Sequence, residues 1–256
     1  MPSRVVDRIK SNITTGIISG IPDGWPTSAA GLTAAFGGYG TWVSAWGCDD
    51  TSGNLTDLIG TNHLVPGLTP TYRNTGAFSG DFAVGFDTGT ADRFVGSSST
   101  VFNMGVSSIA MYCCIKISTV TNRYFMGKGA TRIMALVLES APNGRITAQV
   151  ADGVDLAQST IAADHSGGLW HDVLFVLDRT AERIQAFSNL GTGTAVDTTL
   201  VGNLDSATLF HVGSLASSNI FGCQIAYAAV ATGDIINLRA NGAAAIANIR
   251  RFTGRV

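Results

Sequence analysis

The stretch Leu169–Phe187, LWHDVLFVLDRTAERIQAF, decides the fold class of this chain. Two runs of strand-forming residues flank a short polar turn at Asp178–Glu182. Both parities of the first run are apolar, with Trp170, Leu174 and Val176 on one and Val173, Phe175 and Leu177 on the other. This pattern is typical of a central strand. We therefore expect one face in the core and the other covered by an N-terminal arm, C-terminal helices or a neighbouring subunit. The second run, Arg183–Phe187, predicts the return strand of a hairpin.

The rest of the chain repeats this strand signal. Glycine accounts for 31 of the 256 residues, more than the usual ~7%, and it recurs between short apolar runs. The expected strands include Thr41–Gly47, Asp81–Asp87, Ser108–Ile117, Arg132–Glu139, 145–150, Val154–Ile161, Thr208–Gly213 and Ile220–Val230. About twelve short strands separated by turns predict an all-β sandwich or barrel.

Two strands carry predictions for single side chains. Alternation in Ser108–Ile117 predicts that Cys113 lies in the core and that Cys114 lies on the opposite face. In Ile220–Val230, the side chains expected on one face are Phe221, Cys223, Ile225 and Tyr227.

Three segments divide the chain. Residues 1–40 form a Gly-, Pro- and Thr-rich N-terminal arm, residues 41–232 form the sandwich, and residues 233–256 form a C-terminal helical segment with a basic tail. Asp234 is the expected cap of this segment, and Asn241-Gly242 interrupts it, which predicts one broken helix or two short ones.

Charge is scarce and unevenly spread. Only 13% of the residues are charged, against a typical ~25%, and the mean hydropathy is +0.26, which favours contact with a partner. Residues 41–232 carry a net charge of −6 and the two ends a net charge of +4. Basic ends are either solvated tails or arms that hold an acidic neighbour.

No membrane span is expected, because the apolar stretches Ile109–Ile117 and Ile220–Val230 are shorter than the ~18 residues that a span needs. The first residues contain no apolar core of signal-peptide length, so a conventional secretory route is not expected. We expect no nucleic-acid partner.

No residue qualifies as catalytic, cofactor-binding or metal-binding, and no cofactor is expected. His63, His165, His171 and His211 form no constellation in the sequence. The four cysteines have no zinc spacing, so buried free thiols are favoured, with a Cys48–Cys223 bridge as the alternative. Asp49, Asp50 and Asn54 form a capping turn or, alternatively, hold calcium.

A set of short motifs resembles the laminin-G-like domains of the concanavalin A-like lectin/glucanase superfamily. The matching residues are Trp46-Gly47-Cys48-Asp49-Asp50 with Gly53 and Asp57, Gly85-Phe86-Asp87, Ser108-Ile109-Ala110, Leu169-Trp170-His171-Asp172-Val173 with Asp178, Val212-Gly213 and Phe221-Gly222-Cys223-Gln224-Ile225. The resemblance covers about residues 41–232 and implies a jelly-roll sandwich of two antiparallel sheets.

The chain departs from the family pattern at two places. Phe187-Ser188-Asn189 stands where many relatives have Val-Asp-Gly, and Ala226-Tyr227-Ala228 stands where they have an acidic residue. The aspartates that relatives use for calcium are therefore not carried over. The hydrolase motif Glu-x-Asp-x-Glu is absent, and the only glutamates are Glu139 and Glu182.

These observations favour a non-catalytic structural or assembly protein. The family includes structural attachments, so we expect a virion component of a tailed phage, either a capsid-decorating or a tail-associated subunit, made in the host cytoplasm and contacting other protein subunits as a homo-oligomer. The alternative is a carbohydrate-binding, lectin-like adhesion module at the cell surface, with surface glycans as partners. Aromatic side chains available for sugar stacking are Trp25, Tyr39, Trp42, Trp46 and Tyr72. A glycoside hydrolase is less favoured, because it usually needs two positioned carboxylates. A lyase is also less favoured, because the lyases of the family that the chain resembles have a Gln-x-His strand and Gln224-Ile225-Ala226 lacks the histidine.

Overall fold

The structure is a computed structural model of the 256-residue chain. It describes residues 25–67, 69–77, 81–86, 92–98, 100, 102–118, 123–129, 133–139, 144–213 and 222–255. Most of the expected arm, residues 1–24, lies outside the described residues, as do Asp87 and Phe221 of the motifs above.

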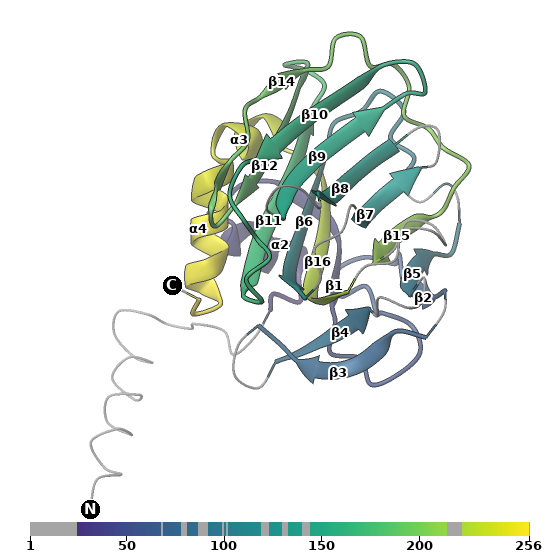
Figure 1. Ribbon diagram of the computed structural model, residues 1–256, viewed down its shortest axis with the longest axis vertical. Helices are drawn as coiled ribbons and strands as arrows, with labels where there is room; N and C mark the ends of the chain where they lie inside the picture. Colours follow the sequence, from purple (N-terminus) through teal and green to yellow (C-terminus); the bar gives the residue numbers. More distant parts are fainter. Residues whose placement is uncertain are drawn as a thin grey trace, which may run out of the picture.

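Two antiparallel sheets pack face to face (Figure 1). The nine-stranded sheet has the order β13 (Gly191–Thr192), β12 (Arg183–Ser188), β11 (Trp170–Asp178), β6 (Ile109–Ile117), β16 (Cys223–Gly233), β4 (Phe82–Phe86) and β3 (Thr71–Thr75), with β1 (Thr41–Gly47) paired to β16 and β14 (Val196–Asp197) paired to β12. The seven-stranded sheet has the order β10 (Leu156–Ile161), β9 (Arg145–Ala151), β8 (Ile133–Glu139), β7 (Arg123–Gly129), β15 (Phe210–Gly213), β5 (Arg93–Gly96) and β2 (Leu64–Pro66). The predicted all-β jelly-roll sandwich is confirmed.

The Leu169–Phe187 hairpin lies inside the nine-stranded sheet. β11 pairs with β12, with Leu177 opposite Ile184, and on its other side it pairs with β6. From Val173 to Leu177 neighbouring strands occupy both edges of β11, so its backbone groups find hydrogen-bond partners on both sides. The predicted central position of this strand is confirmed.

Both faces of β11 are buried, each in a different cluster. Val173, Phe175 and Leu177 lie in the core between the sheets. Leu174 and Val176 lie in a second apolar cluster on the outer face of the nine-stranded sheet. The same split separates Cys113, in the sandwich core, from Cys114, in the outer cluster, as the alternation predicts.

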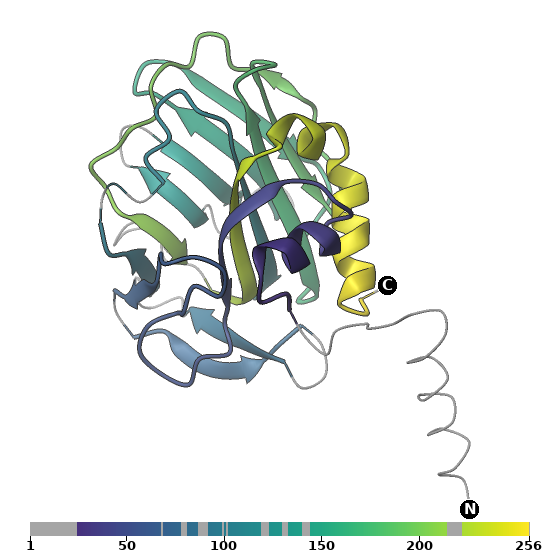
Figure 2. The same cartoon turned by 180° about the vertical axis from the view of Figure 1, so that it is seen from behind.

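Three helices cover that outer face: α2 (Ala29–Ala35), α3 (Ile235–Ala240) and α4 (Gly242–Phe252). Figure 2 shows them in front of the nine-stranded sheet, so that the molecule has three layers. Ser28 caps α2 by accepting from the Gly31 amide at 3.1 Å. Leu32 and Phe36 are fully buried against the sheet. The apolar faces of β11 are therefore covered within the chain, and they do not require a neighbouring subunit.

The C-terminal segment forms two helices that break at Asn241-Gly242, as expected. Asp234 precedes α3, but its carboxylate does not bond the helix backbone. It accepts instead from the Asn237 side chain at 2.6 Å and from the Gly40 amide at 3.3 Å. The predicted side-chain cap at Asp234 is therefore wrong, and this carboxylate holds the start of β1 beside α3.

A β-bulge in β16 overturns one face prediction. Cys223 and Ile225 point into the sandwich core, whereas Tyr227 points to the helices. The register of β16 against β6 shifts between Ile225 and Tyr227, so that Ala226 and Tyr227 both face outward. One extra residue reverses the alternation that follows it.

Candidate binding groove

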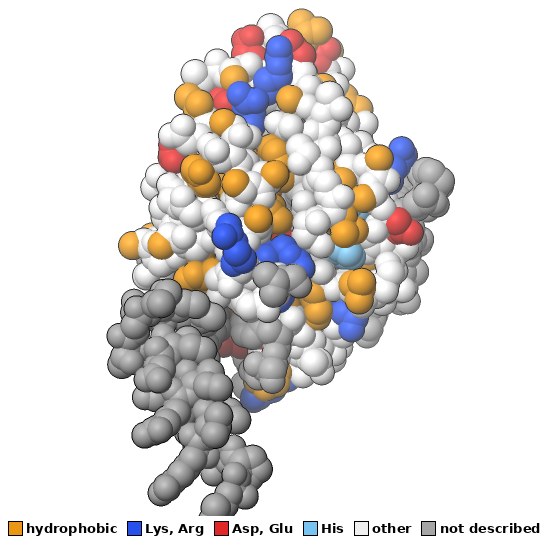
Figure 3. Space-filling view, turned by 90° about the vertical axis from the view of Figure 1, so that its left-hand side faces the viewer, with side chains coloured by type: hydrophobic (Ala, Val, Ile, Leu, Met, Phe, Trp, Pro, Cys, Tyr) orange, Lys and Arg blue, Asp and Glu red, His pale blue; other side chains and the backbone are white. Residues whose placement is uncertain are grey.

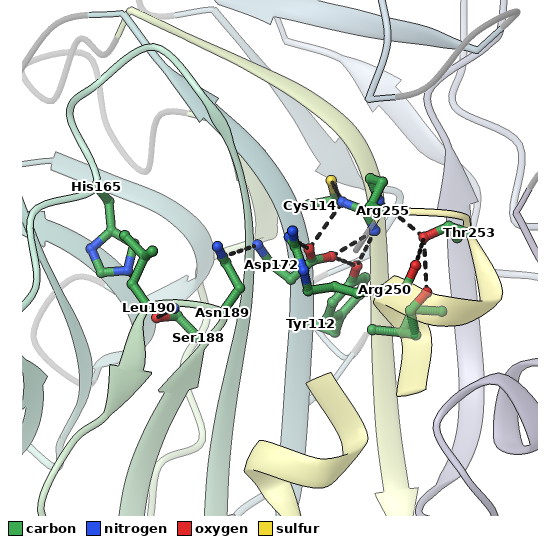
Figure 4. Close-up of polar contacts among 11 residues, drawn as sticks. Tyr112, Cys114, His165, Asp172, Ser188, Asn189, Leu190, Arg250, Thr253 and Arg255 are labelled. Atoms are coloured by element: carbon green, nitrogen blue, oxygen red, sulfur yellow. Dashed lines mark hydrogen bonds and ion pairs between the residues drawn. The ribbon is translucent and has the colours of Figure 1, made fainter. Parts of the chain in front are cut away.

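A buried carboxylate in β11 organises the side of the molecule on which α4 lies. Asp172 has no exposed surface. Its Oδ1 accepts from Arg255 Nη2 at 2.7 Å and from the Tyr112 hydroxyl, and its Oδ2 accepts from Arg250 Nη1 at 2.9 Å and from Arg255 Nη1 at 3.0 Å. Figure 4 shows these side chains converging from β6, β11 and the end of α4. A charge buried this deeply needs paired partners, and Asp172 has two.

Arg255 fastens the C-terminal end of the chain to the sheet. Besides Asp172, it donates to Cys114 Sγ at 2.8 Å and to Thr253 Oγ1 at 3.0 Å. Its guanidinium lies over the Trp25 ring at 4.8 Å, a favourable cation–π position. Burial acts to lower the pKa of Arg255, but Cys114, Tyr112 and Asp172 outweigh it and raise that pKa above its usual value.

A groove of about 470 Å³ opens next to this network, between α4 and the turn that joins β12 to β13. We call it the arginine groove. It is lined by Ser188, Asn189, Gly191, Thr192, Ala243, Ile246, Ala247, Arg250, Arg251 and Arg255. Volumes of roughly 300–1,000 Å³ are typical of small-molecule sites.

The groove is positively charged. Three of its lining residues are arginines, and none of the described lining residues is acidic. Arg251 is exposed, and the contacts of its side chain among the described residues lie within its own helix, with Nη2 2.5 Å from Asn248 Oδ1 and Nε 3.4 Å from the Ala247 carbonyl oxygen. Figure 3 looks onto the side where α4 lies in Figure 1, and basic side chains gather near the middle of this face.

The basic C-terminal residues mostly bind the chain's own acidic body. Arg239 Nε contacts the fully buried Asp178 at 2.9 Å, and Arg250 and Arg255 contact Asp172. Solvated tails and arms for an acidic neighbour were the two expectations for these residues, and neither describes these three. Arg251 alone of the four C-terminal arginines has no carboxylate partner among the described residues.

One buried histidine contacts a residue of the groove wall. The Nε2 atom of His165 lies 2.9 Å from Ser188 Oγ, and that hydroxyl also accepts from the Leu190 amide at 3.1 Å. Burial and the nearby His171 lower the pKa of His165 to about 4, so this ring is neutral at pH 7. The two rings meet edge to face with centroids 5.0 Å apart.

No described carboxylate orients His165, because its Nδ1 has no hydrogen-bond partner in the described structure. A nucleophile–base pair usually has such an orienting group, so we interpret the Ser188–His165 contact as part of the turn. Burial lowers the pKa of His171, while the Asn189 side chain and Asp172 oppose that shift.

The remaining two histidines lie away from the groove. His211 is on β15, and burial together with Arg93 lowers its pKa to about 4. His63 accepts a hydrogen bond from the Asp57 amide at Nδ1. The four histidines therefore form no common site.

The turn at Asp49–Asn54 behaves as a capping turn. Asp50 accepts from the Thr56 amide at 3.1 Å and from the Thr56 hydroxyl at 3.3 Å. No group of three or more potential metal-ligating side chains occurs among the described residues. All four cysteines are buried and unbridged, so the alternative of a Cys48–Cys223 disulfide is wrong.

The aromatic side chains considered for sugar stacking do not form an open platform. Trp25, Trp42 and Trp46 are buried, and Tyr39 and Tyr72 are half-buried. Trp25 stacks on Tyr227 with centroids 4.5 Å apart, and its Nε1 donates to Asp81 Oδ2 at 3.1 Å. These rings stabilise the packing of the helix layer and of the sandwich core.

Sequence reasoning missed the Asp172 network and the groove. A carboxylate inside a strand that is apolar on both faces signals a buried partner. The sequence does not say which of the sixteen basic residues that partner is, since Arg250 and Arg255 are 78 and 83 residues away from Asp172.

Comparisons with solved structures show the same sandwich in other proteins. The chain superposes on the binding domain of Paraclostridial Mosquitocidal Protein 1 with a TM-score of 0.60 at 8% identity, over 75% of this chain and 48% of that one. It superposes on domain 4 of AbnA, a GH43 extracellular arabinanase from Geobacillus stearothermophilus in complex with arabinotriose, with a TM-score of 0.56 at 12% identity, over 78% and 98%. It superposes on the botulinum neurotoxin serotype D binding domain with a TM-score of 0.57 at 10% identity, over 81% and 52%.

No family model matches the sequence, and no curated protein sequence is significantly similar to it. The chain spans about half the length of the mosquitocidal and neurotoxin binding domains. Among the described residues, no helix is long and apolar enough to cross a membrane. At identities of this size the likeness establishes a shared β-sandwich fold, which these two binding domains and domain 4 of AbnA also have.

Proposed function

We propose that this chain is a non-catalytic, lectin-like binding module whose ligand site is the arginine groove. The observation that carries the proposal is that an open groove of about 470 Å³, with polar and cationic walls, lies against a rigid buried network. Binding sites work best when their walls are fixed before the ligand arrives. The shared fold with a domain solved in complex with arabinotriose supports a saccharide as the ligand.

The carboxylates near the groove favour binding over catalysis. Glycoside hydrolysis needs a carboxylic acid and a second carboxylate on either side of the scissile bond. Asp172 is already occupied by two arginines, and no acidic residue lines the groove in the described part of the chain.

The test of this function is a glycan array combined with a turnover assay on the whole chain. We expect the chain to bind one or more of the glycans on the array and to release no new reducing ends from them. Failure of the chain to bind any glycan on the array, neutral or acidic, would contradict the lectin-like role. Release of new reducing ends would contradict the proposed absence of catalysis.

A subunit of a larger assembly, such as a tailed-phage virion, is the second candidate. Its support is the exposure of three apolar side chains near the start of β10, with Val154 91%, Leu156 57% and Leu200 76% exposed. Leu156 and Leu200 line one shared depression. Contiguous exposed apolar surface often marks a protein contact.

The assembly candidate is tested by light scattering after size-exclusion chromatography, comparing the chain with its Leu156→Asp/Leu200→Asp variant. Self-association that the variant abolishes would support it. A monomer at all concentrations, together with no incorporation into particles when co-expressed with capsid and tail proteins, would count against it.

A further inference from the structure

We propose that the arginine groove selects acidic saccharides, meaning sugars that carry a carboxylate or a sulfate, and that Arg251 and Arg250 are the residues that hold the anionic group. This inference rests on the proposed function, because it names the ligand class of the same groove.

The balance of charge in the groove calls for an anion. Asp172 neutralises one of the two guanidiniums that it contacts, and Arg251 adds a further positive charge with no described carboxylate near it. The three arginines together with Asp172 therefore leave a net charge of +2 beside a groove whose described lining has no acidic residue. An anionic group that enters this groove relieves repulsion among the arginines and gains charge-assisted hydrogen bonds.

The two outer arginines have complementary roles. Arg250 is held by its 2.9 Å contact with Asp172, and its side chain is 22% exposed, so part of its guanidinium fork remains available at a fixed position. Arg251 is exposed, and its contacts with Asn248 and Ala247 are local to the helix. A guanidinium fork fits the paired oxygens of a carboxylate or a sulfate in a bidentate manner.

The opposite wall suits the hydroxyl groups of a sugar. It consists of the turn between β12 and β13, where Ser188, Asn189 and Thr192 line the groove. Asn189 is fixed because its Oδ1 accepts from the Asp172 amide at 2.9 Å, and Figure 4 shows it next to the ion-pair network. Thr192 is exposed and its hydroxyl can exchange hydrogen bonds with a ligand.

The lining also disfavours nucleotides. No aromatic side chain lines the groove among the described residues, so it lacks the aromatic platform on which successive bases stack. The described apolar lining consists of Ala243, Ile246 and Ala247, which is enough to contact one face of a sugar ring.

The experiment measures binding of 3′-sialyllactose, 3′-sulfolactose and neutral lactose to the full chain by isothermal titration calorimetry and ligand-observed NMR. The variants are Arg251→Gln and Arg250→Gln. The matched control is Arg183→Gln, because Arg183 is an exposed arginine in the β11–β12 hairpin that pairs with Asp197, outside the groove lining.

We expect 3′-sialyllactose, 3′-sulfolactose or both to bind about tenfold more tightly than lactose. A difference of this size corresponds to one additional charge-assisted hydrogen bond. Arg251→Gln should weaken that probe about tenfold, and Arg183→Gln less than twofold. Affinity should fall with added salt, because partly exposed charges are screened. A preference for sialyllactose or for sulfolactose identifies the anionic group.

Three results would overturn the inference: equal binding of lactose and both acidic probes, binding that Arg251→Gln leaves at the level of Arg183→Gln, and no binding of either acidic probe. If the chain binds neutral glycans with an affinity that the arginine variants do not change, selection of acidic saccharides is refuted while the lectin-like role is not. Loss of binding in the Arg250→Gln variant counts as evidence only if the thermal unfolding midpoint of that variant matches that of the unaltered chain. If the midpoints differ, the test rests on Arg251→Gln, because Arg251 is exposed.

Discussion

Replacing Asp172 by asparagine tests whether the buried ion-pair network holds the helix layer on the sheet. Asparagine has nearly the same shape, so the change removes the charge with little loss of packing. Arg255 and Arg250 then lose their counter-charge, and the Arg255 side chain is only 7% exposed, so water can replace the carboxylate only in part.

Breaking a buried pair by removing one partner typically costs about 3–5 kcal/mol. At about 2–4 °C per kcal/mol for chains of this size class, the melting temperature should fall by about 6–20 °C. The measurements are thermal unfolding for the melting temperature and urea unfolding for the free energy, both followed by fluorescence and circular dichroism, with Asp197→Asn as the control. Asp197 forms an exposed pair with Arg183, where the side chains are 61% and 39% exposed, and exposed pairs stabilise little. We therefore expect no measurable change for the control.

A double variant makes the test specific to the pair. Asp172→Asn with Arg255→Gln removes both charges, so it should be less destabilised than the sum of the two single variants, by about 1–3 kcal/mol of coupling. An unfolding midpoint for Asp172→Asn equal to that of Asp197→Asn, or strict additivity in the double variant, would refute the reasoning.

Three further predictions concern other parts of the fold. The free energy of unfolding should decrease as the pH falls from about 6.5 to about 4, because the pKa values of the buried His165 and His211 are lowered to about 4 while unfolded histidines titrate near 6.5. Urea titrations at several pH values measure this dependence, which should be weaker in the His165→Asn variant. An unchanged pH dependence in that variant would count against the prediction. Gly242→Ala should destabilise the chain by about 1–3 kcal/mol through overpacking, since a methyl group at this position would lie 2.6 Å from the Phe187 ring. Ala243→Ser, on the exposed side of α4, should leave the stability unchanged, and equal melting temperatures for the two variants would contradict the contact. Thiol reagents should label the folded chain slowly, because burial raises the pKa of each of its four thiols, Cys48, Cys113, Cys114 and Cys223. All four should be labelled after unfolding, and rapid labelling of the folded chain would contradict this.

The physical meaning of the apolar surfaces differs from the one that the sequence favoured. Strands that are apolar on both faces were an argument for assembly into a larger particle. In the structure, α2, α3 and α4 cover the second face, so this argument for a neighbouring subunit no longer holds. The exposed patch at Val154, Leu156 and Leu200 now carries the case for a protein partner.

Local patterns in the sequence were sufficient to predict the longer strands of the sandwich. Alternation gave the central place of Leu169–Phe187 and the opposite faces of Cys113 and Cys114, because side chains on a strand alternate with a period of two wherever no bulge intervenes. It did not single out β3, β5 or β7. The same rule failed at Tyr227, where a one-residue bulge that no local pattern marks reverses the faces.

The candidate site depends on contacts between segments that are far apart in the sequence. Asp172 signals that it needs a buried partner, but local rules cannot choose Arg250 and Arg255 from residues 78 and 83 positions away. The choice depends on how α4 packs across the sheet, which is set by the combined burial of many apolar side chains. The arginine groove exists because that packing places the last turn of α4 beside the turn after β12, a juxtaposition of distant segments that no periodicity in the sequence records.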